Sequence, residues 1–213
     1  MARAALHNWE EPCISGVRGS GTVFFSGCPL GCVFCQNNNI ANAKVGKKIS
    51  VERLAEIFLE QQDRGALNIN LVTPTHYIPQ IIKALELSKN QGMNLPVVYN
   101  SGGYEKAEAL KLLDGLVDVY LPDMKYMSPV LAGKYSKAQD YPAAAMAALA
   151  EMFRQVGTPV FEVENPDDNT ATDEAGLIMK RGMIVRHLVL PGCTADSKAV
   201  VKYLYDTYGD DIY

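Results

Sequence analysis

Three cysteines stand close together in the first fifth of the chain. Cys28, Cys32 and Cys35 form the pattern C-x3-C-x2-C, and thiolates at such spacing are ligands for iron–sulfur clusters. A ferredoxin-type cubane takes four protein ligands, yet the other cysteines, Cys13 and Cys193, are remote in sequence. The three thiolates therefore predict a [4Fe–4S] cluster with one open iron, and an open metal position is where a substrate binds.

Two other interpretations of this segment compete with the cluster. A structural zinc site needs a fourth Cys or His at short spacing, which the segment lacks, although His76 or His187 could reach it in space. Buried, inert cysteines are disfavoured because the intervening Gly and Pro mark a loop rather than a core. A cluster is the prediction, and zinc is the alternative.

Composition limits what kind of protein this is. The chain has 213 residues with 48% hydrophobic content, which suits a single α/β domain over residues 1–213. Its net charge of −4 argues against a nucleic-acid-binding protein. The start has no apolar signal segment, no run is long enough to span a membrane, and five cysteines are not a disulfide framework. We expect a cytoplasmic protein that has no membrane partner.

Strand and helix signals alternate along the chain. Strands are expected at residues 22–26, 69–72, 97–99, 117–121 and 183–190. Helices are expected at residues 50–65, 77–91, 105–113, 142–157 and 196–208. Residues 1–20 are a lead-in, residues 160–182 a hairpin insertion with a polar tip at 165–173, and Ile212 begins a further strand. Such alternation predicts parallel strands with right-handed crossovers.

Periodicity does not choose between an open α/β sheet and a partial barrel. In both, ligands bind at the C-terminal ends of the strands. The cysteine loop leaves the C-terminal end of the first expected strand, so we expect it on the functional face.

The cysteine motif, with Phe34 directly before the last cysteine, resembles the signature of the radical S-adenosylmethionine (AdoMet) superfamily. Residues 11–28, Glu-Pro-Cys-Ile-Ser-Gly-Val-Arg-Gly-Ser-Gly-Thr-Val-Phe-Phe-Ser-Gly-Cys, resemble the lead-in of pyruvate formate-lyase activating enzymes, and more closely a poorly characterised branch of activating-enzyme-like iron–sulfur proteins. The resemblance implies a partial (βα)6 TIM-like barrel whose strand six is incomplete here. It also implies a [4Fe–4S] cluster and AdoMet as cofactors.

The resemblance also implies roles for residues after each strand. Phe34 would lie near the adenine. Where the family has Gly-Gly-Glu, this chain has Thr73-Pro-Thr-His76, so Thr73 would meet the amino group through its hydroxyl or a carbonyl. Asn100 stands where an Asp receives the same ammonium group.

Two further segments complete the implied AdoMet site. Asp123-Met-Lys125 resembles an Asp-x-Lys motif, in which Asp123 accepts from the ribose and Lys125 pairs with the carboxylate; an exposed ion pair is the alternative. Arg186 lies in an apolar expected strand and needs an anionic partner. That partner is the AdoMet carboxylate by resemblance, or a structural Glu.

The implied activity is that of a radical AdoMet oxidoreductase. Catalysis would depend on Cys28, Cys32 and Cys35, whose cluster reductively cleaves AdoMet to a 5′-deoxyadenosyl radical for hydrogen abstraction. The preferred role is activation of a glycyl radical enzyme, with a flavodoxin or ferredoxin-type electron donor. The alternatives are a radical enzyme acting on a small molecule, a peptide or RNA, and a non-catalytic iron–sulfur or zinc protein.

Overall fold

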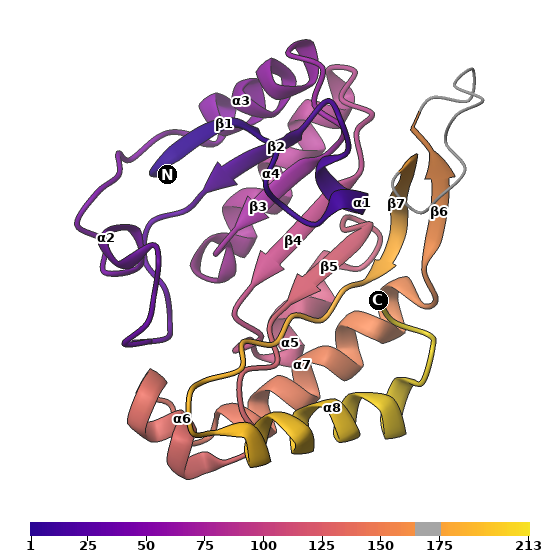
Figure 1. Cartoon of the computed structure of the whole chain (residues 1–213). Helices are drawn as coiled ribbons and strands as arrows, with labels where there is room; N and C mark the ends of the chain where they lie inside the picture. Colours follow the sequence, from indigo (N-terminus) through magenta and orange to yellow (C-terminus); the bar gives the residue numbers. More distant parts are fainter. Residues whose placement is uncertain (165–175) are drawn as a thin grey trace.

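The computed structural model describes residues 1–164 and 176–213. Within these ranges the backbone forms one seven-stranded sheet of order β1-β2-β3-β4-β5-β7-β6 (Figure 1). The strands are β1 (Arg3–His7), β2 (Ser20–Phe24), β3 (Ile69–Val72), β4 (Val97–Ser101), β5 (Val119–Pro122), β6 (Val160–Val163) and β7 (Leu177–Met183). Strands β2, β3, β4, β5 and β7 are parallel, whereas β1 and β6 run antiparallel at the two edges. The sheet is therefore open, as in a partial barrel.

Helices connect the parallel strands. They are α1 (Pro12–Ser15), α2 (Asn38–Ala41), α3 (Val51–Asp63), α4 (Ile78–Asn90), α5 (Ala107–Leu110), α6 (Pro129–Ser136), α7 (Tyr141–Val156) and α8 (Thr194–Tyr208), with 3-10 turns η1 (Thr75–Tyr77) and η2 (Lys111–Leu113). Helix α3 begins where the Ser50 side chain accepts a hydrogen bond from the Arg53 amide, as an N-cap should. The α/β architecture predicted from the sequence is confirmed.

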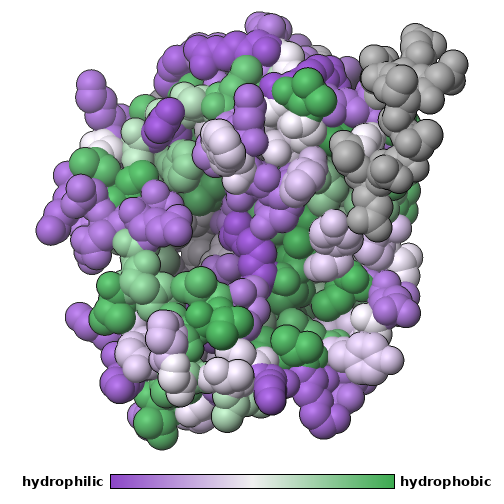
Figure 2. Space-filling model, in the orientation of Figure 1, coloured by the Kyte–Doolittle hydropathy of each residue, from purple (hydrophilic) through white to green (hydrophobic). Residues whose placement is uncertain are grey.

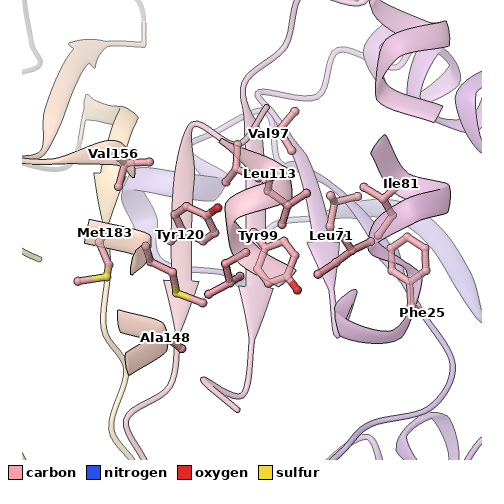
Figure 3. Close-up of a cluster of buried hydrophobic side chains, with 14 of the residues drawn as sticks. Phe25, Leu71, Ile81, Val97, Tyr99, Leu113, Tyr120, Ala148, Val156 and Met183 are labelled. Carbon is pink, nitrogen blue, oxygen red and sulfur yellow. The ribbon is translucent and has the colours of Figure 1, made fainter. Parts of the chain in front are cut away.

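The two faces of the sheet have different coverings because side chains alternate along each strand. On one face, Leu71, Tyr99 and Tyr120 belong to the main apolar core, which α3, α4 and α7 cover (Figure 3). On the other face, Val98 and Leu121 pack with Ile14 of α1. The lead-in thus lies on the inner face of the open sheet, in front of β4 and β5 in Figure 1.

The observed elements correct the expected ones in two places. The strand expected at 183–190 is wrong: β7 ends at Met183, and beyond it there is a single bridge between Asp123 and Arg186. An apolar run becomes a strand only where a neighbour completes the ladder, and β7 takes its ladder from β5 and β6. The helix expected at 105–113 is broken into α5 and η2.

The other departures are at the edges of the sheet. Strand β1 was not predicted, and β2 begins two residues before its predicted start. Strands β6 and β7 are the two arms of the expected hairpin, but its predicted tip, 165–173, lies outside the described residues. Tyr213 exchanges backbone hydrogen bonds with Met183 and Val185, each 3.0 Å long, so the last residue extends the sheet beside the end of β7.

Candidate active site

The cysteine loop follows β2 and is fixed to two short helices. The amide of Cys28 donates to the carbonyl of Ala41 in α2 at 3.0 Å. The amide of Gly31 donates to the carbonyl of Ser136 in α6, also at 3.0 Å. Because both bonds involve the backbone, they fix the path of the loop independently of its side chains.

The three thiols share one electrostatic environment. The pKa of the Cys28 thiol is raised to about 11, mainly by burial; the neighbouring Cys32 and Cys35 contribute in the same direction, while a backbone hydrogen bond and Lys125 act in the opposite direction. In the described part of the chain, no three His, Cys, Asp or Glu side chains converge tightly enough for a single metal ion. The ligand assignment therefore depends on the motif.

The donor set fits a cluster with three protein ligands. Three half-buried thiols on one loop are soft ligands suited to iron–sulfur chemistry, and binding would release their protons. His187 is held elsewhere, by the Met124 carbonyl at 2.7 Å and the Ser197 hydroxyl at 2.9 Å. His76 lies beside Gly27, since a Cβ on that glycine would stand 3.9 Å from its Nδ1.

One cysteine has polar partners that sequence reasoning missed. The Cys32 sulfur lies 3.0 Å from the Ser136 hydroxyl, which lies 2.8 Å from the Tyr126 hydroxyl. Both partners follow β5 along the chain, and no motif marks them. Phe34 is half-buried and packs against the main core, so its aromatic ring is fixed beside the thiols.

The structure brings four of the predicted AdoMet residues together at the C-terminal ends of β4 and β5. The guanidinium of Arg186 donates to the Asn100 side-chain oxygen at 2.6 Å. Its Nε lies 3.4 Å from a carboxylate oxygen of Asp123. Lys125 pairs with the other oxygen of Asp123 at 2.5 Å, and the pair is largely shielded from solvent. Lys125 also acts on Cys28, which links this ionic group to the cysteine loop.

Glu10 completes the ionic group and was missed from the sequence. One oxygen of Glu10 accepts from Arg186 at 3.2 Å, and the other accepts from Asn70 at 2.8 Å and from Asn100 at 3.0 Å. Arg186 thus has a structural Glu as partner, which is the alternative that the sequence left open. Beside it, burial raises the pKa of Glu11. No periodic signal could have shown that the lead-in folds back onto the strand ends.

The Tyr141 hydroxyl is hydrogen-bonded to the backbone of the Asp123–Lys125 segment. This buried hydroxyl lies 2.9 Å from the carbonyls of Gly102 and Asp123, and it accepts from the Lys125 amide at 2.9 Å. A helix residue far along the chain therefore sets the backbone of two predicted site residues. Its sequence signal, a Tyr at the start of an apolar helix, is that of an ordinary core residue.

Thr73 and its neighbours form the turn that departs from the family pattern. Thr73 has a positive φ of 57°, which a β-branched residue adopts only when its surroundings hold it there. Its amide donates to the Asn100 carbonyl at 2.9 Å. The Thr75 hydroxyl donates to Glu105 at 2.8 Å. Glu105 is only 4% exposed, and burial raises its pKa to about 7.

Comparison with known proteins identifies the family. The model of the radical SAM superfamily matches residues 22–173, which include the cysteine loop and the ends of β3, β4 and β5. The chain belongs to the radical SAM superfamily. An uncharacterized protein of Methanocaldococcus jannaschii is 37% identical over 146 residues, which cover 64% of this chain and 41% of that protein. The chain thus spans about two fifths of the length of its curated relative.

The surface of this radical SAM chain is hollowed near the strand ends. Figure 2 shows a recess left of centre, over the region where β3 and β4 end in Figure 1. A cavity of about 360 Å³ has a lining that includes Phe25, Ser26, Tyr77 and Lys47. None of the predicted AdoMet residues lines that cavity. None of the described helices is long and apolar enough to cross a membrane.

Proposed function

We propose that this radical SAM enzyme activates a glycyl radical enzyme by abstracting hydrogen from a glycine of that partner. The observation that carries the proposal is the open sheet: the cysteine loop and the Asp123–Arg186 group lie at strand ends that no further strand of the described residues encloses. A wide mouth suits an extended peptide loop better than a small substrate, which needs closer enclosure. The partner loop would supply the missing wall and exclude water.

The thiols of the cysteine loop would hold the cluster. When bound and reduced, a [4Fe–4S] cluster supplies the electron that splits AdoMet into methionine and the hydrogen-abstracting 5′-deoxyadenosyl radical. Lys125, beside Cys28, would pair with the AdoMet carboxylate, and Asp123 would accept hydrogen bonds from the ribose. Phe34 would contact the adenine, and Thr73 would meet the amino group.

Arg186 has a different part in this proposal. Its guanidinium is already engaged by Glu10, Asn100 and Asp123. It would therefore orient Asn100 and Asp123 toward AdoMet and offset the acidic charge around them, in addition to any contact with the AdoMet carboxylate. A charged side chain fixed by several partners is already in place when the ligand binds, which favours binding.

The test is a mixing experiment under strictly anaerobic conditions. Reconstituted enzyme, reduced through a flavodoxin or ferredoxin-type donor, is incubated with AdoMet and with each candidate glycyl radical enzyme of the same genome. A glycine-centred doublet in electron paramagnetic resonance supports the proposal, and the Cys32→Ala variant, which lacks one cluster ligand, should give none. AdoMet cleavage that proceeds without the doublet for every candidate would refute the activating role.

One observation favours a second candidate, a radical SAM enzyme acting on another substrate. The Thr75 hydroxyl, which stands in the turn that replaces Gly-Gly-Glu, is occupied by Glu105. Because this turn differs in sequence from the family pattern and its Thr75 hydroxyl already has a partner, the site around the AdoMet amino group would differ from that of activating enzymes. AdoMet cleavage that is stimulated by a small molecule, a peptide or an RNA, and not by any glycyl radical enzyme, would support this candidate.

A further inference from the structure

Positive charge is concentrated around the cysteine loop, although the protein as a whole is acidic. Between Glu11 and Glu52 the sequence has no Asp or Glu, but it has Arg18, Lys44, Lys47 and Lys48. Arg18 pairs with Glu164 just after β6, so the charge near the cysteine loop is that of the three lysines. The whole chain has a net charge of −4, so the rest of it carries −8. Such asymmetry makes one surface attractive to an acidic partner that the remaining surface repels.

The three lysines form a surface that we name the lysine segment, residues 43–49. All three side chains are exposed, and within the described residues none of them forms an ion pair. Exposed charges without a partner inside the protein are free to meet charges on another molecule. Val45, exposed at 44%, adds an apolar contact between Lys44 and Lys47.

The lysine segment lies directly against the backbone that carries the first cluster cysteine. The hydroxyl of Ser26 donates to the carbonyl of Val45 at 2.5 Å. A Cβ on Gly46 would stand 3.0 Å from the Cβ of Ser26, so the two stretches are in close contact. Ser26 is two residues before Cys28. A molecule that docks on the segment would therefore be separated from the cysteine loop by one layer of backbone.

The cavity of about 360 Å³ lies under the same segment. Its floor is apolar, with Phe25, Ile49 and Leu54, while Lys47 and Lys48 are among its lining residues. An apolar hollow beside cationic side chains offers both short-range packing and electrostatic steering to a docking partner.

We propose that the lysine segment is the docking surface for an acidic one-electron carrier protein, through which electrons reach the cysteine loop. Each encounter would transfer one electron: the reduced carrier loses it, and the oxidised cluster gains it. The inference depends on the superfamily's need for an electron and not on which molecule gives up the hydrogen atom. Redox encounters are small and transient, and a patch of three lysines beside the redox centre suits such an encounter.

The experiment compares two triple variants of equal charge. Lys44→Glu/Lys47→Glu/Lys48→Glu reverses the segment. Lys89→Glu/Lys106→Glu/Lys198→Glu reverses three exposed lysines elsewhere in the chain, none of which forms an ion pair within the described residues. Both variants change the net charge by the same amount, so a difference between them reports the charge of the lysine segment and not the net charge of the protein. The probe carrier is flavodoxin hydroquinone, and the uncharged bypass reductant is photoreduced deazaflavin.

The first readout is the rate at which the reconstituted cluster is reduced, followed by its visible absorbance without AdoMet. We expect the segment variant to be reduced by flavodoxin on the order of 10-fold more slowly at low salt, and wild type to lose this advantage as salt screens the charges. Deazaflavin should reduce all three proteins equally. Because no glycyl radical enzyme is present, failure of the proposed function cannot affect this result.

The second readout is binding of oxidised flavodoxin to cluster-free protein by calorimetry. Wild type and the control variant should bind equally, and the segment variant more weakly. Equal reduction rates in both triple variants would overturn the proposal, as would equal slowing with deazaflavin. Binding of an RNA oligonucleotide that is lost in the segment variant alone, with flavodoxin reduction intact, would assign the segment to nucleic acid instead.

Discussion

Replacing Glu105 with Gln should remove one component of the pH dependence of stability. Glu105 is buried behind the Thr73–His76 turn, where one oxygen accepts from Thr75 and the other has no partner. Burial raises the pKa of this carboxyl from 4.5 to about 7, against the hydrogen bond from Thr75. Gln has nearly the same shape, keeps an oxygen for Thr75 and does not titrate.

The sign follows from where the proton is bound. Between pH 4.5 and about 7 the folded protein keeps the proton on Glu105, whereas the unfolded chain has released it. The contribution of Glu105 to the unfolding free energy is therefore fully present below pH 4.5 and is lost as the pH rises through about 7. A pKa difference of about 2.5, at about 1.4 kcal/mol per pKa unit, corresponds to about 3 kcal/mol of unfolding free energy.

The assay is urea unfolding of reduced, cluster-free protein at several pH values from 5 to 8. The unfolding free energy of wild type minus that of Glu105→Gln should fall by about 2 to 3 kcal/mol across this range. Glu108→Gln is the control, because its carboxylate is exposed and pairs only with Lys111; its difference should stay nearly flat. A flat or rising difference for Glu105→Gln would show that the carboxyl is ionised in the folded protein, contrary to this reasoning.

Three more predictions concern the site. Anaerobic reconstitution should give about four irons per chain, and changing any cluster cysteine to Ala should abolish them while Cys13→Ala does not; stoichiometric zinc in protein purified without oxygen would contradict this. Asp123→Asn should weaken AdoMet binding, measured by calorimetry, by about 1.5–3 kcal/mol with iron content unchanged; unaltered affinity would remove Asp123 from the site. Gly103→Ala should lower the unfolding free energy, measured in urea, by at least about 2 kcal/mol. The reason is that Gly103 has a φ of +75° and that a Cβ there would stand 2.2 Å from the Asp123 carbonyl oxygen. An unfolding free energy equal to that of wild type would refute this constraint.

Local patterns in the sequence predicted the scaffold well. Strand β3 was expected at its observed bounds, residues 69–72, because a short apolar run between turn signals is a clear strand pattern. The cysteine loop was expected after a strand, and it follows β2. The strand expected at 183–190 failed because its register depends on neighbours that are distant in sequence. Pairing partners are a property of the whole sheet, and a local pattern cannot specify them.

The sequence singled out candidate residues that lie together only where they come at or after the ends of parallel strands. Asn100, Asp123 and Arg186 were each chosen from their own segment, and the topology brings them together. Glu10 and Tyr141 were missed, because Glu10 lies in the lead-in and Tyr141 lies in a helix that covers the sheet. Their contacts depend on tertiary packing, and their residue types are ordinary for a loop and for a helix.

The position of Glu10 changes how the lead-in should be understood. The Arg186 side chain is 31% exposed, and a partly buried guanidinium is stabilised by a nearby carboxylate. Glu10 supplies that carboxylate across 176 residues of sequence. The same carboxylate binds Asn70 and Asn100, so it also fixes side chains on two neighbouring strands. Removing it would leave Arg186 partly uncompensated and release Asn100, a predicted AdoMet contact. The lead-in is thus part of the site, because it sets the charge and orientation of residues that the strands provide.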